Sequence, residues 1–475
     1  MAARALDVDL LARELGNWRT ATVSGPAYLG LADALRLLII DGRLPVGARL
    51  PSERALAEAL RVSRTTVTAA FTQLRDDGYL NARRGARSTA ALPRRAESPG
   101  DTRPARISLA AAALNAPSSA ILTAFSAATT DIAPYLRETG LEVMGVCELR
   151  TAIAEHYCAR GLPTDPSEIM VTSGAQHAIN LILATHTRPG DRVLVEQPTY
   201  HGALSAITTA GARAVPVALT DDGWELDAVH AAVRQLAPAL AYLVPDCHNP
   251  TGFTLPAAER KRLGHIISET RTRTVVDESI VDMWDDEAPP EPLAAYVPRQ
   301  NLVLSVGSMS KSFWGGLRVG WIRADHDTLA TIAAIRPSVD LGSAIFEQLA
   351  AARLLADHTA VVSERRAVLR DRRAFLTTLL ARELPDWQPG TGRDGLSLWV
   401  KLPAPMSTAL SAAAARLGLD LPAGPRFGVD GTLERFIRVP YALAEPQLEE
   451  AVALMARAWR SITGTESTDN RSLVV

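Results

Sequence analysis

Lysine is nearly absent from this chain. Only Lys261, Lys311 and Lys401 are lysines, and arginine carries almost all of the positive charge. Where a sequence uses arginine for ordinary charge, a remaining lysine is more often kept for chemistry that a guanidinium does not perform, since an amine can lose its proton and form a Schiff base with an aldehyde. Lys311 follows Ser308 and precedes Arg318. It is the strongest candidate for a reactive side chain.

Cysteine is also scarce, and long apolar runs are missing. The three cysteines, Cys147, Cys158 and Cys247, form no closely spaced motif, which argues against a disulfide framework and against a metal site. We expect them to be buried free thiols in a reducing cytoplasm. No run of about 18 apolar residues occurs, so no membrane span is expected. No apolar signal segment follows Met1, which supports a cytoplasmic location.

The charges are unevenly distributed. The chain has 475 residues and a net charge of −2, and its length favours two or three domains. Residues 1–106 contain 17 arginines against 11 acidic residues, whereas the remainder contains 33 basic against 41 acidic residues. A basic N-terminal part before an acidic body is typical of nucleic-acid contact at one end. A solvated basic face would give the same charge pattern.

The N-terminal part has the pattern of three short helices. Apolar residues at helical spacing predict a helix over 32–40, and Pro51 and Ser52 predict the start of a second one. Ser63 is expected to cap a third helix that runs from Arg64 to about Asp77. A short basic hairpin over 81–88 follows. Helix, turn, helix and hairpin is the order of a winged DNA-binding module.

The start of the third helix carries the side chains that a major groove requires. Short hydrogen-bonding side chains reach phosphates there, and an arginine can donate two hydrogen bonds to a guanine edge. Ser63, Arg64, Thr65 and Thr66 supply both kinds. An isolated run of this type is more often an ordinary capped helix. Here the hairpin and the upstream Arg54 favour double-stranded DNA as a partner.

These residues resemble the winged helix-turn-helix of the GntR family. The resemblance rests on residues 50–67, on Gly78, Tyr79 and Leu80, and on Arg84 and Gly85, and it covers residues 25–88. The family usually has an arginine where this chain has Thr68. The resemblance implies that the following residues contact DNA: Arg54, Ser63, Arg64, Thr65, Thr66, Thr68, Arg84 and Gly85.

Residues 87–106 are rich in proline and show no periodicity, which predicts a linker. A flexible linker of this length spans about 25 Å, enough to reach a neighbouring subunit. Short β-branched runs then alternate with helical stretches from residue 168 to about 322. This alternation predicts an α/β domain with a mainly parallel central sheet. After about residue 340, longer helices and two strands predict a small C-terminal α+β lobe. The division is 1–86, 87–106, 107–463 and a tail at 464–475.

The predicted α/β domain contains side chains that suit pyridoxal 5′-phosphate. This cofactor needs an amine for its aldehyde, a carboxylate for its ring nitrogen, donors for its phosphate and an aromatic ring against its face. Lys311 supplies the amine and Asp277 the carboxylate. Tyr200 is the aromatic candidate, and Asn249 is a donor for the ring's 3-oxygen. Each of these residues alone has an ordinary structural explanation, but their joint order is uncommon.

The phosphate has its own candidates. Residues 173–176 follow a predicted strand and open a helix, whose free N–H groups suit an anion. The residues expected there are Gly174, Ala175 and Gln176, joined later in the chain by Ser308 and Arg318. No metal is expected.

The order and spacing of these residues resemble the fold-type I aminotransferase family across roughly 107–463. Arg438 matches that family's arginine for the substrate carboxylate. A GntR-type winged helix ahead of such a domain resembles the MocR subfamily of transcriptional regulators. The resemblance implies a homodimer, head-to-tail, with cofactor sites at the subunit interface. Two tyrosines of the family are missing here. One touches the cofactor two or three residues after the aspartate, where this chain has Ser279 and Ile280, and the other reaches the partner subunit's phosphate, where this chain has Leu141.

Three functions follow from this organisation. The first is a DNA-binding transcriptional regulator whose aminotransferase-like domain senses pyridoxal phosphate, an amino-acid-like effector, or both. The second is a working aminotransferase with an appended DNA-binding domain, against which the missing tyrosines count. The third is a regulator whose body has lost the cofactor and only dimerises. Lys311, Asp277, Asn249 and Arg318 together count against the third.

Overall fold

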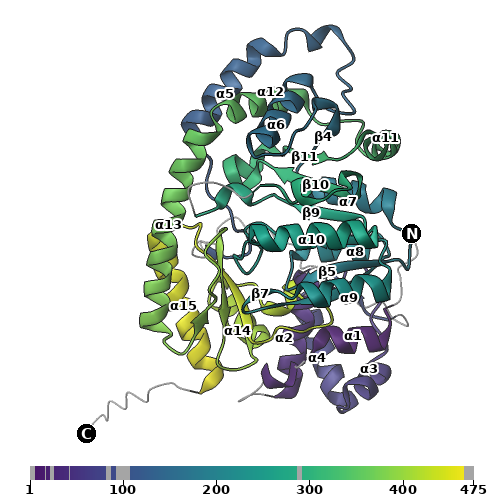
Figure 1. The fold of residues 1–475 in the computed structure, drawn as a ribbon. Coiled ribbons are helices and arrows are strands. Elements are labelled where there is room, and N and C mark those ends of the chain that lie inside the picture. Colours follow the sequence, from purple (N-terminus) through teal and green to yellow (C-terminus); the bar gives the residue numbers. More distant parts are fainter. Residues whose placement is uncertain are drawn as a thin grey trace.

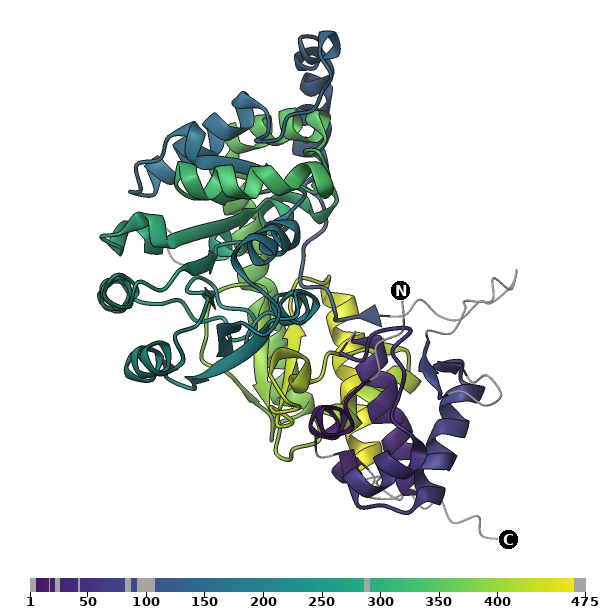
Figure 2. The same ribbon diagram turned by 90° about the vertical axis from the view of Figure 1, so that its right-hand side faces the viewer.

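The computed structural model describes residues 6–16, 18–21, 26–41, 43–81, 87–91, 107–285 and 291–464. Figures 1 and 2 show a small helical unit at the N-terminus, a large sheet covered by helices, and a C-terminal lobe. No helix in the described ranges is long and apolar enough to cross a membrane. Of the predicted linker at 87–106, residues 92–106 lie outside the described residues, as do residues 465–475 of the predicted tail at 464–475.

The N-terminal unit packs its helices around one apolar core that includes Leu35, Leu56 and Phe71. Ser63 caps the third predicted helix, as expected, because its Oγ accepts a hydrogen bond of 3.1 Å from the N–H of Thr66. A first helix with a buried Trp18 after it was not predicted. The elements are α1 (Val8–Leu15), α2 (Ala27–Ile40), α3 (Glu53–Leu60), α4 (Arg64–Asp76), and the antiparallel pair β1 (Leu80–Asn81) and β2 (Thr89–Ala90).

The large domain contains the predicted, mainly parallel sheet. Its strand order is β4-β11-β10-β9-β8-β5-β6-β7, and only β11 and the end strand β7 are antiparallel to their neighbours. The short apolar runs of the sequence predict strands over 169–172, 192–195, 214–219, 240–244, 274–277, 302–306 and 319–322, and the limits of each lie within two residues of an observed strand. The strands are β4 (Ile169–Thr172), β5 (Arg192–Gln197), β6 (Arg213–Thr220), β7 (Gly223–Trp224), β8 (Leu240–Leu243), β9 (Thr274–Asp277), β10 (Val303–Ser308) and β11 (Gly320–Arg323).

Helices cover both faces of this sheet (Figure 1). Alternate strand residues therefore enter two separate apolar clusters: Val193 and Val195 pack on one face and Leu194 on the other. The helices are α5 (Ser118–Asp131), α6 (Cys147–Ala159), α7 (Ala175–His186), α8 (His201–Thr209), α9 (Leu226–Leu236), α10 (Ala257–Thr270), α11 (His326–Ile335) and α12 (Ile345–Ala356).

The C-terminal lobe has its own core and a three-stranded antiparallel sheet of order β12-β13-β15. The first strand of the body, β3 (Ile107–Ser108), pairs in parallel with β14 of the lobe. The first residues of the body therefore lie in the C-terminal lobe, before the chain continues to the large sheet. The lobe consists of α13 (His358–Glu383), β12 (Gln388–Pro389), β13 (Ser397–Lys401), α14 (Ser407–Arg416), β14 (Leu419–Asp420), β15 (Phe436–Pro440) and α15 (Glu445–Thr463).

The N-terminal unit rests on this lobe (Figure 2), where α2 packs against α14. Two ion pairs cross the contact: Arg416 to Asp33 at 3.0 Å and Arg426 to Asp41 at 3.3 Å. Gly431 has a positive φ of 70°. A Cβ there would lie 2.6 Å from the backbone oxygen of Arg13, so only glycine allows this close approach.

One expectation about the cysteines was wrong. All three are free thiols, but only Cys247 is buried, whereas Cys147 and Cys158 are exposed. Both exposed cysteines lie on α6, which presents Leu149 and Ile153 to the core and other positions to solvent. A sequence-wide preference for buried cysteine does not decide which face of an amphipathic helix a residue occupies.

Candidate functional site

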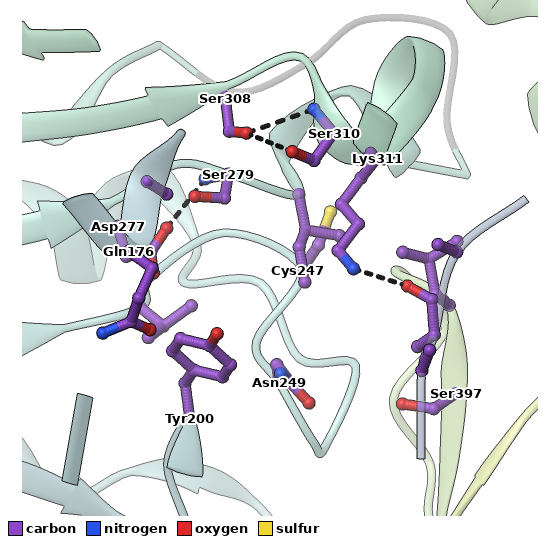
Figure 3. Close-up of a pocket in the computed structure, with 18 of the residues that line it drawn as sticks. Gln176, Tyr200, Cys247, Asn249, Asp277, Ser279, Ser308, Ser310, Lys311 and Ser397 are labelled. Carbon is purple, nitrogen blue, oxygen red and sulfur yellow. Dashed lines mark hydrogen bonds between the residues drawn. The ribbon is translucent and has the colours of Figure 1, made fainter. Parts of the chain in front are cut away.

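A cavity of about 330 Å³ opens where β9 and β10 end, beside the C-terminal lobe. The carboxyl ends of parallel strands are the usual place for ligands in such sheets. Residues 110–113, which we call the roof segment, form one wall of the cavity. Figure 3 shows Lys311, Tyr200, Asn249 and Ser279 among the residues that line it. The fold thus brings together segments that are far apart in the sequence, from the roof segment to Arg438.

Lys311 projects into the cavity from a single π-turn, Ser310–Trp314, directly after β10. Its Nζ donates a 2.8 Å hydrogen bond to the backbone oxygen of Ala112 in the roof segment. Burial lowers the pKa of Lys311 to about 8, with a contribution in the same direction from the positive charge of Arg438, and Asp277 partly opposes both. The amine is therefore partly neutral near physiological pH, the form in which it is a nucleophile.

The low pKa of Lys311 predicts a specific pH dependence. The rate at which pyridoxal phosphate attaches to the protein should rise with pH and level off above about pH 8, whereas an exposed lysine would still gain neutral amine near pH 10. Stopped-flow absorbance measures the rate, and the same reaction with a free lysine derivative corrects for titration of the cofactor. A rate that keeps rising to about pH 10 would show that the pKa of the amine is not depressed.

Asp277 lies at the end of β9 and is 6% exposed. It accepts a 2.5 Å hydrogen bond from the hydroxyl of Tyr242 and a 2.9 Å hydrogen bond from the N–H of Ser279. Tyr242 comes from the neighbouring strand β8, where it pairs with Val275. The sequence did not single out Tyr242, because the contact depends on which strands are neighbours. These two donors hold the carboxylate in one orientation at the cavity wall.

The predicted phosphate site lies where α7 begins. Gly174 has a φ of 92° and precedes the first turn of α7, whose N–H groups have no partner within the helix. Arg318 donates a 2.7 Å hydrogen bond to the backbone oxygen of Ser173. A Cβ on Gly174 would lie 2.7 Å from the Arg318 guanidinium, so glycine keeps this corner open. Ser308 Oγ lies 3.0 Å from Ser310 Oγ, which adds a second hydroxyl that was not predicted.

Two neighbours of this corner have other contacts. Ala175 is the first residue of α7. The side-chain amide of Gln176 donates a 3.1 Å hydrogen bond to the backbone oxygen of Gly202, at the start of α8. Both residues line the cavity. They are therefore placed to offer backbone N–H groups to an anion, while the Gln176 side chain fixes α8.

Arg438 lies on β15, buried at the opposite side of the cavity. It donates to the backbone oxygens of Ala110 and Leu109, and to the side-chain oxygen of Asn249 at 3.4 Å. Burial, and next the charge of Arg426, lower the pKa of Arg438, but a guanidinium remains protonated at neutral pH. These three acceptors, from the described part of the chain, are all neutral oxygens. A ligand carboxylate could replace them.

Tyr200 is the residue before α8 and lies across the cavity from Ser308 (Figure 3). His201, Cys247 and His248 also line the cavity, and sequence reasoning did not select them. The sequence could have indicated them only by their position, since each lies within two residues of Tyr200 or Asn249, which were selected. The two departures also have clear positions: Ser279 and Ile280 line the cavity, whereas Leu141 is 57% exposed.

The residues present fit pyridoxal phosphate. The cavity joins a partly neutral amine, a fixed carboxylate and a helix start with a nearby guanidinium. Ser279 Oγ is buried at this wall and has no hydrogen-bond partner among the described residues. A buried polar atom without a partner is costly. It therefore marks a place that a polar group of a ligand would satisfy.

Four of the predicted DNA-binding residues are exposed on the N-terminal unit, and we call them the predicted DNA-binding patch. Arg54, Ser63, Arg64 and Thr65 lie at the starts of α3 and α4, and Ser63, Arg64 and Thr65 are exposed. The Ser63 hydroxyl lies 2.7 Å from that of Thr65 and 2.8 Å from that of Thr66. The Thr68 hydroxyl instead donates to Glu53 at 2.7 Å, so Thr68 is turned toward the protein. Arg84 and Gly85, the predicted tip of the wing, lie outside the described residues.

Two known families match different parts of the chain. Residues 119–454 match aminotransferase class I and II, and residues 27–89 match the bacterial regulatory proteins of the gntR family. The HTH-type transcriptional regulator YisV of Bacillus subtilis (strain 168) is 28% identical, over 81% of this chain and 86% of YisV. A Rhizobium meliloti protein named "Probable rhizopine catabolism regulatory protein MocR" is 27% identical, over 76% of this chain and 78% of its own.

Solved structures give the same picture of the body. LysN, an alpha-aminoadipate aminotransferase from Thermus thermophilus complexed with N-(5'-phosphopyridoxyl)-L-leucine, is 27% identical. It aligns with a TM-score of 0.68 over 76% of this chain and 93% of LysN. The two-domain layout is consistent with the MocR subfamily. The chain belongs to the aminotransferase class I and II family, and it carries a helix-turn-helix domain of the GntR family ahead of the aminotransferase domain.

Proposed function

We propose that this protein is a DNA-binding transcriptional regulator whose aminotransferase-like domain binds pyridoxal phosphate and responds to an amino-acid-like effector. The proposal rests on two features found in one chain. One is the exposed start of α4 with Arg64, and the other is the cavity in which the pKa of Lys311 is lowered. A helix-turn-helix places the start of its second helix at base edges. The body supplies a pocket in which a ligand can favour one arrangement over another.

Each cofactor-binding residue has a role in this proposal. Lys311 provides the amine, Asp277 pairs with the ring nitrogen, and Tyr200 covers the ring face. Asn249 donates to the 3-oxygen. Gly174, Ala175 and Gln176 at the start of α7 would hold the phosphate, with Ser308 and Arg318 as further donors. When bound, pyridoxal phosphate supplies an aldehyde and an electron-withdrawing ring. Asp277, held in place by Tyr242, would face the ring nitrogen and favour its protonated form.

The effector is proposed to be a small molecule with an amine and a carboxylate. The amine would exchange with Lys311, and the carboxylate would bind Arg438 through two parallel hydrogen bonds. Support comes from the neutral partners of Arg438, which are backbone oxygens and one amide oxygen. Because Ser279 and Ile280 stand where the related enzymes have a tyrosine, the bound effector should persist rather than turn over.

A head-to-tail homodimer completes the proposal, with domains at 1–86 and 107–463 joined by a linker at 87–106 and followed by a tail at 464–475. Large apolar side chains of the body are exposed: Leu136 is 73% exposed, Leu141 57% and Leu341 46%. Leu141 and Leu341 belong to adjacent segments, since a Cβ on Gly342 would lie 2.8 Å from the backbone oxygen of Glu142. Exposed apolar patches of this kind mark protein interfaces.

The effector proposal predicts the behaviour of an Arg438→Gln variant. Wild-type protein loaded with pyridoxal phosphate should change both its absorbance and its DNA affinity in the same range of amino-acid concentration. Arg438→Gln should keep cofactor attachment but weaken the amino-acid response by about tenfold or more, since a charged hydrogen bond contributes roughly 1.5–3 kcal/mol. Titration followed by absorbance and by DNA binding measures both effects.

The control for Arg438→Gln is Arg435→Ala, which removes an arginine of the same region that donates to the backbone oxygen of Pro403. It should respond like the wild type. If no amino acid alters the absorbance while pyridoxal phosphate alone changes DNA affinity, the cofactor is the signal and the amino-acid effector is wrong.

A working aminotransferase is the second candidate, because the body is similar to an aminotransferase of known structure. The discriminating measurement is complete transamination between an amino acid and a keto acid. Sustained turnover would favour the enzyme. A single half-reaction without turnover would favour the regulator.

A further inference from the structure

A short 3-10 turn, η10 (Gly424–Phe427), lies between the cavity and the N-terminal unit. On the cavity side, the ring of Phe427 packs under the Arg438 guanidinium, whose carbon is 5.0 Å from the ring centroid. The backbone oxygen of Phe427 accepts a 2.8 Å hydrogen bond from Thr199, next to Tyr200. The rings of His201 and Phe427 are nearly perpendicular, at 84°, with 5.8 Å between their centroids. The turn therefore touches both the effector arginine and the segment that carries the ring-covering tyrosine.

The neighbouring residue in the turn, Arg426, reaches in both directions. One terminal nitrogen lies 3.3 Å from Nε2 of His201, which lines the cavity. The other lies 3.3 Å from the carboxylate of Asp41, the residue that ends α2. Burial holds the pKa of His201 well below its usual value. Its ring is thus neutral, and Nε2 can accept a hydrogen bond from Arg426.

The ion pair between Arg426 and Asp41 has little contact with solvent. The side chain of Asp41 is 11% exposed and that of Arg426 is 18% exposed, so the pair is poorly screened by solvent. Burial raises the pKa of Asp41, while Arg426 and Arg43 lower it. A carboxylate with so little exposure depends on the position of its partners, because loss of Arg426 would leave only Arg43 to offset its charge. A small change at Arg426 therefore changes the stability of the contact that holds α2.

We propose that Arg426 couples the occupancy of the cavity to the position of the DNA-binding unit. The inference rests on the proposed function, since it names the residue through which the cavity regulates DNA binding. A ligand at Arg438 or beneath Tyr200 alters the surroundings of Phe427 and His201, and Arg426 carries that difference to Asp41. Coupling of this kind is reciprocal: DNA changes cofactor affinity by the same factor as the cofactor changes DNA affinity.

The second ion pair between the unit and the lobe provides a matched control. Arg416 binds Asp33 at 3.0 Å, but its side chain is 57% exposed, so solvent screens the pair. Arg416 ends α14 and does not line the cavity. Replacing Arg416 therefore removes one contact between the N-terminal unit and the lobe but keeps Arg426 and its contact with the cavity residue His201.

The experiment uses full-length protein, pyridoxal phosphate with and without an amino acid, and duplex DNA selected by the wild type from a random library. The variants are Arg426→Ala, Arg416→Ala and the double variant Arg426→Met with Asp41→Asn, which leaves no unpaired buried charge. The first measurement is the ratio of DNA dissociation constants without and with the ligand. The second, which needs no DNA, is hydrogen exchange of the backbone amides near the end of α2, residues 37–41.

In the wild type we expect the ligand to change DNA affinity by roughly 5–150-fold, the usual range for coupled sites, and to change exchange at residues 37–41. Both Arg426 variants should bind pyridoxal phosphate, yet show a ratio within about twofold of one and no ligand-dependent exchange. Arg416→Ala should keep the wild-type ratio. If the Arg426 variants respond like the wild type, the coupling role is wrong and the proposed function stands. If ligand-dependent exchange requires Arg426 but the wild type binds no DNA, the proposed function is wrong and the contact still couples.

Discussion

Replacing Lys311 with alanine is expected to abolish the visible absorbance that pyridoxal phosphate gains when it attaches to the protein. Lys311 is the half-buried lysine that lines the cavity, and its depressed pKa makes it the expected reactive amine. DNA binding should remain measurable, because the DNA-binding patch belongs to a separate core around Leu35 and Phe71. Absorbance titration and a DNA-binding assay on the same preparation measure both effects.

The other two lysines provide controls for Lys311→Ala. Lys261 is exposed on α10, and Lys401 lies on β13, 3.6 Å from Asp221. Lys261→Ala and Lys401→Ala should keep the wild-type spectrum. Attachment that survives Lys311→Ala and disappears in either of these variants would place the reactive amine elsewhere and overturn the assignment of the cavity.

The second large effect is expected at the start of α4. Arg64→Ala should weaken DNA binding by roughly 1–3 kcal/mol, the usual contribution of an arginine that donates two hydrogen bonds to guanine. Combined with Arg54→Ala, the loss should be larger, and the salt dependence of binding should become less steep where a phosphate contact is lost. Binding isotherms at several salt concentrations separate these contributions.

Arg457→Ala is the matched control, because Arg457 is an exposed arginine on α15 of the lobe. It should bind DNA like the wild type. Footprints that are unchanged when Arg54 and Arg64 are both replaced would show that another surface of the protein contacts DNA.

Local features of the fold could be predicted because they depend on neighbours in the chain. The Ser63 cap is set by one hydroxyl and one backbone N–H three residues later. Seven of the eight strands of the large sheet were located to within two residues from short apolar runs, whereas the two-residue strand β7 was not predicted. The first helix, α1, was not predicted, although Asp7 caps it through two backbone N–H groups. The helix has only eight residues, which is too short for its apolar periodicity to be distinguished from chance.

Contacts between distant elements could not be predicted. Tyr242 meets Asp277 only because β8 and β9 are neighbours in the sheet. Arg438 was placed by resemblance, but its partners in the roof segment depend on how the lobe folds back on the body. The same holds for Arg426, whose sequence context carries no signal of its two partners, since they lie on different structural units.

The roof segment has a consequence for measured affinities. Its backbone oxygens already accept hydrogen bonds from both Lys311 and Arg438, so the chain itself is a competitor for the two groups that a ligand needs. An intramolecular competitor acts at an effective concentration that dilution does not lower. The apparent dissociation constant of any ligand is therefore raised in inverse proportion to the fraction of molecules in which the segment has released these two groups. Loosening the segment near Ala110 should tighten ligand binding even though no contact to the ligand is added.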